Sequence, residues 1–133
     1  VLKLTNAYEV GRAMNPALAH QQIVGGAWMG ISHALYETTE PYYPDRAHGP
    51  LDFSEYLMPG PADLAEMDSV IIERPASNGP YGAKGIGEMT ANSPIPAIAN
   101  AIFDACGVRV TSLPITPEKV LRGLDALHAG NPV

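Results

Sequence analysis

Residues 15–37 read NPALAHQQIVGGAWMGISHALYE and predict the longest helix of the chain. Asn15 is a preferred N-cap residue, Pro16 suits the first helical position, and no further proline follows within the stretch. The interior holds three glycines, each costing up to about 1 kcal/mol relative to alanine. They are Gly25, Gly26 and Gly30. We therefore expect close packing along this helix to offset their cost.

One face of this helix combines small and polar residues. Gln22, Gly26, Met29 and His33 recur at spacings of three and four and share that face. Small residues there admit either another backbone or a ligand. Two interpretations stay open: the helix packs tightly on a sheet, with Gln22 satisfying a buried carbonyl, or Gln22 contacts a ligand.

Residues 79–88, GPYGAKGIGE, form the most unusual stretch outside the helix. Four glycines in ten residues allow backbone amides to approach a ligand closely, Lys84 supplies a cation and Glu88 supplies a candidate base. The alternative is an ordinary flexible connection. A Walker A loop is excluded because Gly85 follows Lys84 where a serine or threonine is required, and Thr90 breaks the dinucleotide fingerprint.

The remaining elements are short. Residues 1–10 and 68–74 have strand-like patterns, and residues 108–110 suggest a further short strand. Helices are expected from Ser93 to Gly107, with Cys106 in the core, and from Thr116 onward. We predict one α+β domain over residues 1–133. Its mixed sheet of short strands is packed by the long glycine-containing helix and by a second helix after the glycine-rich loop.

Composition restricts the possible partners and compartment. The 133 residues carry a net charge of -6 at a pI near 5.0, which argues against nucleic acid. No apolar run reaches the ~20 residues of a membrane span, so no membrane partner is expected. Cys106 is the only cysteine, which predicts the reducing cytoplasm. The four widely spaced histidines indicate no zinc site.

Taken in order, these motifs resemble the molybdenum hydroxylases, the family of xanthine dehydrogenase and aldehyde oxidase. The similarity rests on Asn15-Pro16, then Gln22, then the helix glycines, and most strongly on residues 84–88, KGIGE. The segment at residues 116–120, TPEKV, follows in the family's order. The chain resembles the C-terminal segment of the family's molybdopterin-binding large subunit.

The resemblance implies a role for each motif. Glu88 takes the position of the catalytic general base of an enzyme that oxidises an aldehyde, a purine or an N-heterocycle with water as oxygen source. Gln22 and the backbone of Lys84, Gly85 and Ile86 take positions that contact molybdopterin, the molybdenum cofactor. No residue of this chain is expected to ligate the metal. Met89-Thr90 departs from the prolines that often follow the glutamate in the family.

Length sets the expected state of the chain. Family large subunits are several times longer, so the cofactor is expected in the assembled enzyme and not in the isolated chain, which we expect to be inactive. The expected partners are the remainder of the molybdenum-binding subunit and iron–sulfur and FAD electron-transfer proteins. The rival hypothesis is a non-catalytic remnant or interaction module, in which the glycine-rich helix packs against a second copy as a homo-oligomer.

Overall fold

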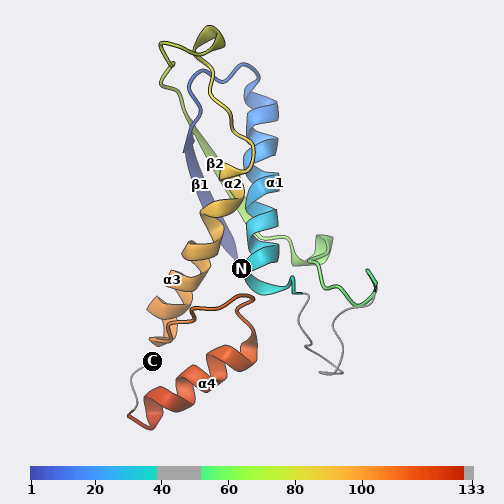
Figure 1. Cartoon of the computed structure of the whole chain (residues 1–133), viewed down its shortest axis with the longest axis vertical. Helices are drawn as coiled ribbons and strands as arrows, with labels where there is room; N and C mark the ends of the chain where they lie inside the picture. Colours follow the sequence, from blue (N-terminus) through green and yellow to red (C-terminus); the bar gives the residue numbers. More distant parts are fainter. Residues whose placement is uncertain (39–51, 131–133) are drawn as a thin grey trace. The chain divides into compact units, whose positions relative to one another are not determined.

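The computed structural model describes residues 1–38 and 52–130 (Figure 1). The elements are, in chain order, β1 (Lys3–Glu9), α1 (Pro16–Leu35), a 3₁₀ turn (Pro61–Asp63), β2 (Glu66–Ile72), a 3₁₀ turn (Pro80–Gly82), α2 (Met89–Asn92), α3 (Pro94–Cys106) and α4 (Pro117–His128). The α+β class is confirmed. None of the helices in this described part is long and apolar enough to cross a membrane.

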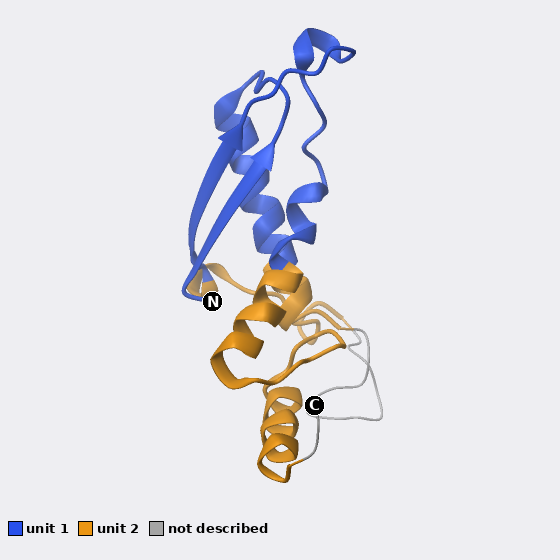
Figure 2. Ribbon diagram, turned by 90° about the vertical axis from the view of Figure 1, so that its left-hand side faces the viewer, with its two compact units in different colours: residues 1–30, 64–94 blue, residues 31–63, 95–133 orange. Residues whose placement is uncertain are grey.

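The chain divides into two compact units (Figure 2). The first contains residues 1–30 and 64–94, and the second contains residues 31–63 and 95–133. The single domain expected over residues 1–133 stays a prediction.

The sheet of the first unit has two described strands, β1 and β2, which run parallel in the register Lys3↔Glu66 to Glu9↔Ile72. Both strands were predicted from sequence and are confirmed. The predicted mixed sheet is wrong for the described residues, because a mixed sheet needs an antiparallel pair as well as a parallel one. Lys3 forms ion pairs of 2.8 Å with both Glu66 and Asp68 at the start of the sheet.

Helix α1 covers one face of this strand pair (Figure 2). Asn15 caps the helix as predicted, because its Oδ1 accepts a hydrogen bond from the Leu18 amide at 3.1 Å. Ile23 and Ala27 are completely buried on α1, and His20 is hydrogen-bonded to Ser69 of β2. The first unit therefore has its core between α1 and the sheet.

The second unit is built around α3 and α4. Thr116 caps α4 as expected, accepting from the Lys119 amide at 3.4 Å, and the Ile115 amide donates to the Ala34 carbonyl at 2.7 Å. The predicted strand at residues 108–110 is wrong. A strand needs a neighbour for its backbone hydrogen bonds, whereas Val108 is 1% exposed and packs against Gly123 of α4.

Cys106 is the last residue of α3 and is only half-buried. Its thiol donates to the Ile102 carbonyl at 3.1 Å, one helical turn earlier. The prediction that Cys106 lies in the core is therefore too strong, since the end of a helix leaves part of its apolar face open.

Candidate functional site

The glycine-rich stretch at residues 79–88, called the glycine loop below, lies beside the end of β1. An isolated antiparallel bridge joins Gly11 to Ala83. The Arg12 amide donates to the Gly82 carbonyl at 2.9 Å, and the Lys84 amide donates to the Val10 carbonyl at 3.1 Å. These backbone contacts hold residues 82–84 against the segment that leads into α1, although the two segments lie about 70 residues apart in sequence.

The Gly87 carbonyl is the point at which α1 holds the other end of the loop. It accepts a hydrogen bond from Gln22 Nε2 at 3.1 Å and another from Thr90 Oγ1 at 2.9 Å. Because both lone pairs of this carbonyl are engaged, the backbone immediately before Glu88 is fixed from two sides. Tyr8 adds a third connection, since its hydroxyl donates to the Thr90 carbonyl at 3.2 Å and is hydrogen-bonded to Ser93.

Glu88 stands at the N-cap of the short helix α2, with φ −76° and ψ −12°. Its side chain is exposed and makes no capping hydrogen bond, while its carbonyl accepts from the Ala91 amide at 3.0 Å. The carboxylate is thus held on an ordered backbone without being used to hold that backbone in place. A carboxylate in that situation is free to accept a proton from a ligand.

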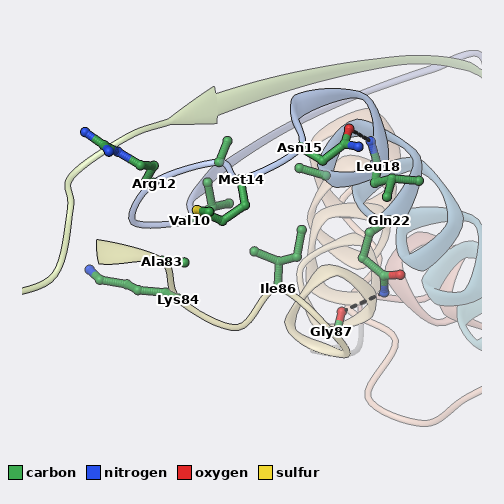
Figure 3. Close-up of a pocket in the computed structure, with 12 residues that line it drawn as sticks. Val10, Arg12, Met14, Asn15, Leu18, Gln22, Ala83, Lys84, Ile86 and Gly87 are labelled. Atoms are coloured by element: carbon green, nitrogen blue, oxygen red, sulfur yellow. Dashed lines mark hydrogen bonds between the residues drawn. The ribbon is translucent and has the colours of Figure 1, made fainter. Parts of the chain in front are cut away.

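A cavity of about 400 Å³ opens between the start of α1 and the glycine loop (Figure 3). Its lining is Val10, Arg12, Ala13, Met14, Asn15, Leu18, Ala19, Gln22, Ala83, Lys84, Ile86 and Gly87. Three residues predicted from sequence to contact a cofactor, namely Gln22, Lys84 and Ile86, come together here. The predicted Gly85 and Glu88 lie next to lining residues in sequence but are not among them. The volume falls within the range of small-molecule sites.

Lys84 is the cation that the sequence placed in this loop, and its ammonium group is paired with the Glu9 carboxylate. The Lys84 hydrogen bond, together with the Gly11 amide that donates to Glu9 Oε1 at 2.6 Å, holds the pKa of Glu9 below its ordinary value. The positive charge of Lys84 is therefore already balanced by the Glu9 carboxylate.

Sequence reasoning missed several lining residues, among them Arg12 and Met14. They come from the turn between β1 and α1, and only the long-range bridge to the glycine loop makes that turn one wall of the cavity. The sequence feature that could have indicated this turn is the dipeptide Gly11-Arg12, which directly follows the first strand-like stretch. In the described ranges, no group of three histidine, cysteine or acidic side chains is placed to hold a metal ion.

Comparison with known proteins gives a consistent result. Residues 1–65 match the family described as molybdopterin cofactor-binding domain. The chain is 36% identical over 131 residues to the 6-hydroxypseudooxynicotine dehydrogenase complex subunit gamma of Paenarthrobacter nicotinovorans, covering 96% of this chain and 16% of that protein. It is 37% identical over 124 residues to the aldehyde oxidoreductase of Megalodesulfovibrio gigas, covering 92% and 13% respectively.

Solved structures agree with these sequence matches. Quinoline 2-oxidoreductase from Pseudomonas putida 86 superposes with a TM-score of 0.77 at 28% identity, over 90% of this chain and 15% of that one. Aldehyde oxidoreductase from Desulfovibrio gigas gives 0.70 at 36% identity, over 90% and 13%. In every one of these comparisons the chain spans less than one fifth of its relative.

Proposed function

Because this chain belongs to the molybdenum hydroxylase family, as a segment of the molybdopterin-binding subunit, we propose that it completes the cofactor site of an assembled oxidoreductase. The observation that carries the proposal is the meeting of Gln22, Lys84 and Ile86 at one cavity. Beside that cavity, two hydrogen bonds to the Gly87 carbonyl fix the backbone that presents Glu88.

The residues present suit the polar edges of a pterin. Among the described residues, the amides of Gly85 and Ile86 make no hydrogen bond, so both are available as donors. A Cβ built on Gly85 meets no atom within 4 Å, which leaves room for a ligand against the backbone. Gln22 uses Nε2 on the loop and retains Oε1 as an acceptor. The Lys84 amide is engaged with Val10, so Lys84 would contribute its carbonyl.

When bound, molybdopterin supplies through its molybdenum the two-electron oxidation that places a water-derived oxygen on an electron-poor carbon. Glu88 supplies the base. Its carboxylate accepts the proton that leaves the attacking oxygen, and its exposed position at the start of α2 keeps it free for that transfer. Gln22 orients the loop and the pterin together, because it can contact both.

The substrate class follows the relatives, whose names include an aldehyde oxidoreductase, a probable hypoxanthine oxidase and a quinoline 2-oxidoreductase. We propose an aldehyde, a purine or an N-heterocycle. The 6-hydroxypseudooxynicotine relative is named as one subunit of a complex. We accordingly propose that this chain works with the rest of the molybdenum-binding subunit and with iron–sulfur and FAD partners that remove the electrons.

The test is the Glu88→Gln variant of the assembled enzyme, compared with Asp104→Asn. Asp104 is an exposed carboxylate on α3 in the other compact unit and is not a lining residue of the cavity, so its replacement removes the same charge without changing the lining. We expect Glu88→Gln to lower kcat by ~10²- to 10⁴-fold, the usual contribution of a general base. Molybdenum and pterin content should stay at the wild-type level, and Asp104→Asn should behave like the wild type.

Two results would count against the proposal. Undiminished turnover in Glu88→Gln would remove Glu88 as the base. A protein isolated from its native source without a larger partner, molybdenum or pterin would instead support the remnant hypothesis.

A further inference from the structure

The cavity beside the glycine loop has two chemically different ends (Figure 3). Gln22 and Gly87 lie at one end, joined by their hydrogen bond, and Ile86 lies between the ends. Arg12 and Lys84 extend to the opposite side. The lining of the cavity therefore has amide groups at one end and two cationic side chains at the other.

The position of Arg12 depends on an unusual backbone at Gly11. Gly11 has φ +69°, and a Cβ at this residue would lie 2.4 Å from the Gly82 carbonyl oxygen. Both features favour glycine at this position. The Arg12 amide then donates to that same Gly82 carbonyl. The contact places Arg12 at the cavity in a defined backbone geometry.

The two cations differ in how they are neutralised. Lys84 is paired with Glu9, whereas the guanidinium of Arg12 has no ion pair or hydrogen bond among the described residues. No described residue that lines the cavity carries a carboxylate. Arg12 is consequently the cation whose charge is left for a ligand.

We propose that Arg12 binds a phosphate group of the cofactor, at the end of the cavity away from Gln22. This inference rests on the proposed function. Molybdopterin carries a phosphate on its side chain, either as a monoester or as a diphosphate to a nucleotide. Guanidinium groups bind phosphate oxygens through paired hydrogen bonds, which an ammonium group cannot reproduce. Arg12 is thus a cofactor-binding residue and plays no part in the proton transfer of Glu88.

The experiment compares the assembled enzyme as wild type, Arg12→Gln, Arg12→Lys and Arg122→Gln. Arg122 is an exposed arginine of α4 in the second unit and serves as the matched control. Molybdenum and pterin are measured per polypeptide, and the rate of pterin release is followed by fluorescence after dilution. We expect release about tenfold faster in Arg12→Gln, in line with loss of a charge-assisted hydrogen bond. Arg12→Lys should fall between, and Arg122→Gln should match the wild type.

Acid hydrolysis of the released cofactor separates the two phosphate sources, since only the diphosphate form yields a nucleotide. If Arg12→Gln does not fold, as judged by circular dichroism, the comparison of Arg12→Lys with the wild type decides the matter. Wild-type pterin release in a folded Arg12→Gln or Arg12→Lys enzyme would overturn the inference and leave the proposed function intact. A wild-type enzyme that contains no molybdenum or pterin would overturn the proposed function and the inference with it.

Discussion

Gly26 of α1 lies directly against Thr90 of α2. A Cβ at position 26 would stand 1.8 Å from Thr90 Oγ1 and 2.6 Å from Thr90 Cβ, and Thr90 itself has no exposed surface. The same Thr90 hydroxyl donates to the Gly87 carbonyl. The missing side chain of Gly26 therefore lets α1 and the residues around Glu88 pack at a distance that no other residue type permits.

Gly26→Ala should destabilise the protein. Overpacking of a close contact costs about 1–3 kcal/mol, which exceeds the helix-propensity gain of up to about 1 kcal/mol from replacing glycine. Thermal unfolding of the purified protein measures the effect.

Gly25→Ala is the matched control, since a Cβ at that neighbouring position meets no atom within 4 Å. We expect Gly25→Ala to leave the melting temperature unchanged or to raise it. Equal effects of the two substitutions would show that α1 is not packed at Gly26 as the structure describes.

The local signals in the sequence predicted α1, α3 and α4, but not the short helix α2. Asn15 and Thr116 each cap a helix through a side-chain hydrogen bond to a residue three positions later. Caps of this kind are interactions between near neighbours and can be read from short stretches. Gly25 and Gly26 illustrate the opposite case, because they are equivalent in sequence and only the approach of Thr90 distinguishes them.

The pairing of strands that lie far apart in the sequence could not be predicted from the sequence. The parallel partner of β1 is 63 residues away, and a strand at residues 108–110 was predicted from β-branched residues although no strand forms there. The same limit applied to the site. Gln22, Lys84 and Ile86 were proposed from motifs, whereas Arg12 joins them through the bridge between Gly11 and Ala83.

Tyr8→Phe should loosen the same region. The Tyr8 hydroxyl donates to the part-buried Thr90 carbonyl and is also hydrogen-bonded to the exposed Ser93 hydroxyl, so its removal leaves the Thr90 carbonyl without this partner. We expect a loss of about 1 kcal/mol in the free energy of unfolding. Tyr81→Phe makes the same chemical change on a residue that is 79% exposed and should have no effect. An equally small change in both variants would contradict the role assigned to Tyr8.

The pKa of Glu9 should depend on Lys84. The hydrogen bond from Lys84 is the largest cause of the lowered pKa of Glu9, followed by the Gly11 amide. Since the folded-state pKa lies below the unfolded value, the ionised carboxylate stabilises the fold above the unfolded value. That contribution is lost as the pH falls through the folded-state pKa.

An NMR titration of the Glu9 carboxylate checks this assignment. In Lys84→Met we expect its pKa to rise toward the ordinary glutamate value. Lys3→Met removes a lysine that pairs with Glu66 and Asp68 and should leave the Glu9 titration unchanged. A Glu9 pKa that is the same in the wild type and Lys84→Met would show that the pair does not form in solution.

Gly123 and Val108 should be energetically coupled in the second unit. A Cβ at Gly123 would lie 2.3 Å from Val108 Cγ1 and 3.1 Å from Cγ2, so Gly123→Ala should cost about 1–3 kcal/mol by overpacking. Val108→Ala removes both methyl groups and should also destabilise, because Val108 is buried.

In the double variant the nearest atom of residue 108 is its Cβ, 3.2 Å away, so the new methyl group fills the space that the valine vacates. Chemical denaturation of all four proteins should therefore give a double-variant loss smaller than the sum of the single losses by about 0.5–3 kcal/mol. Strict additivity would mean that α4 does not pack on Val108, and that the residue is buried by some other contact.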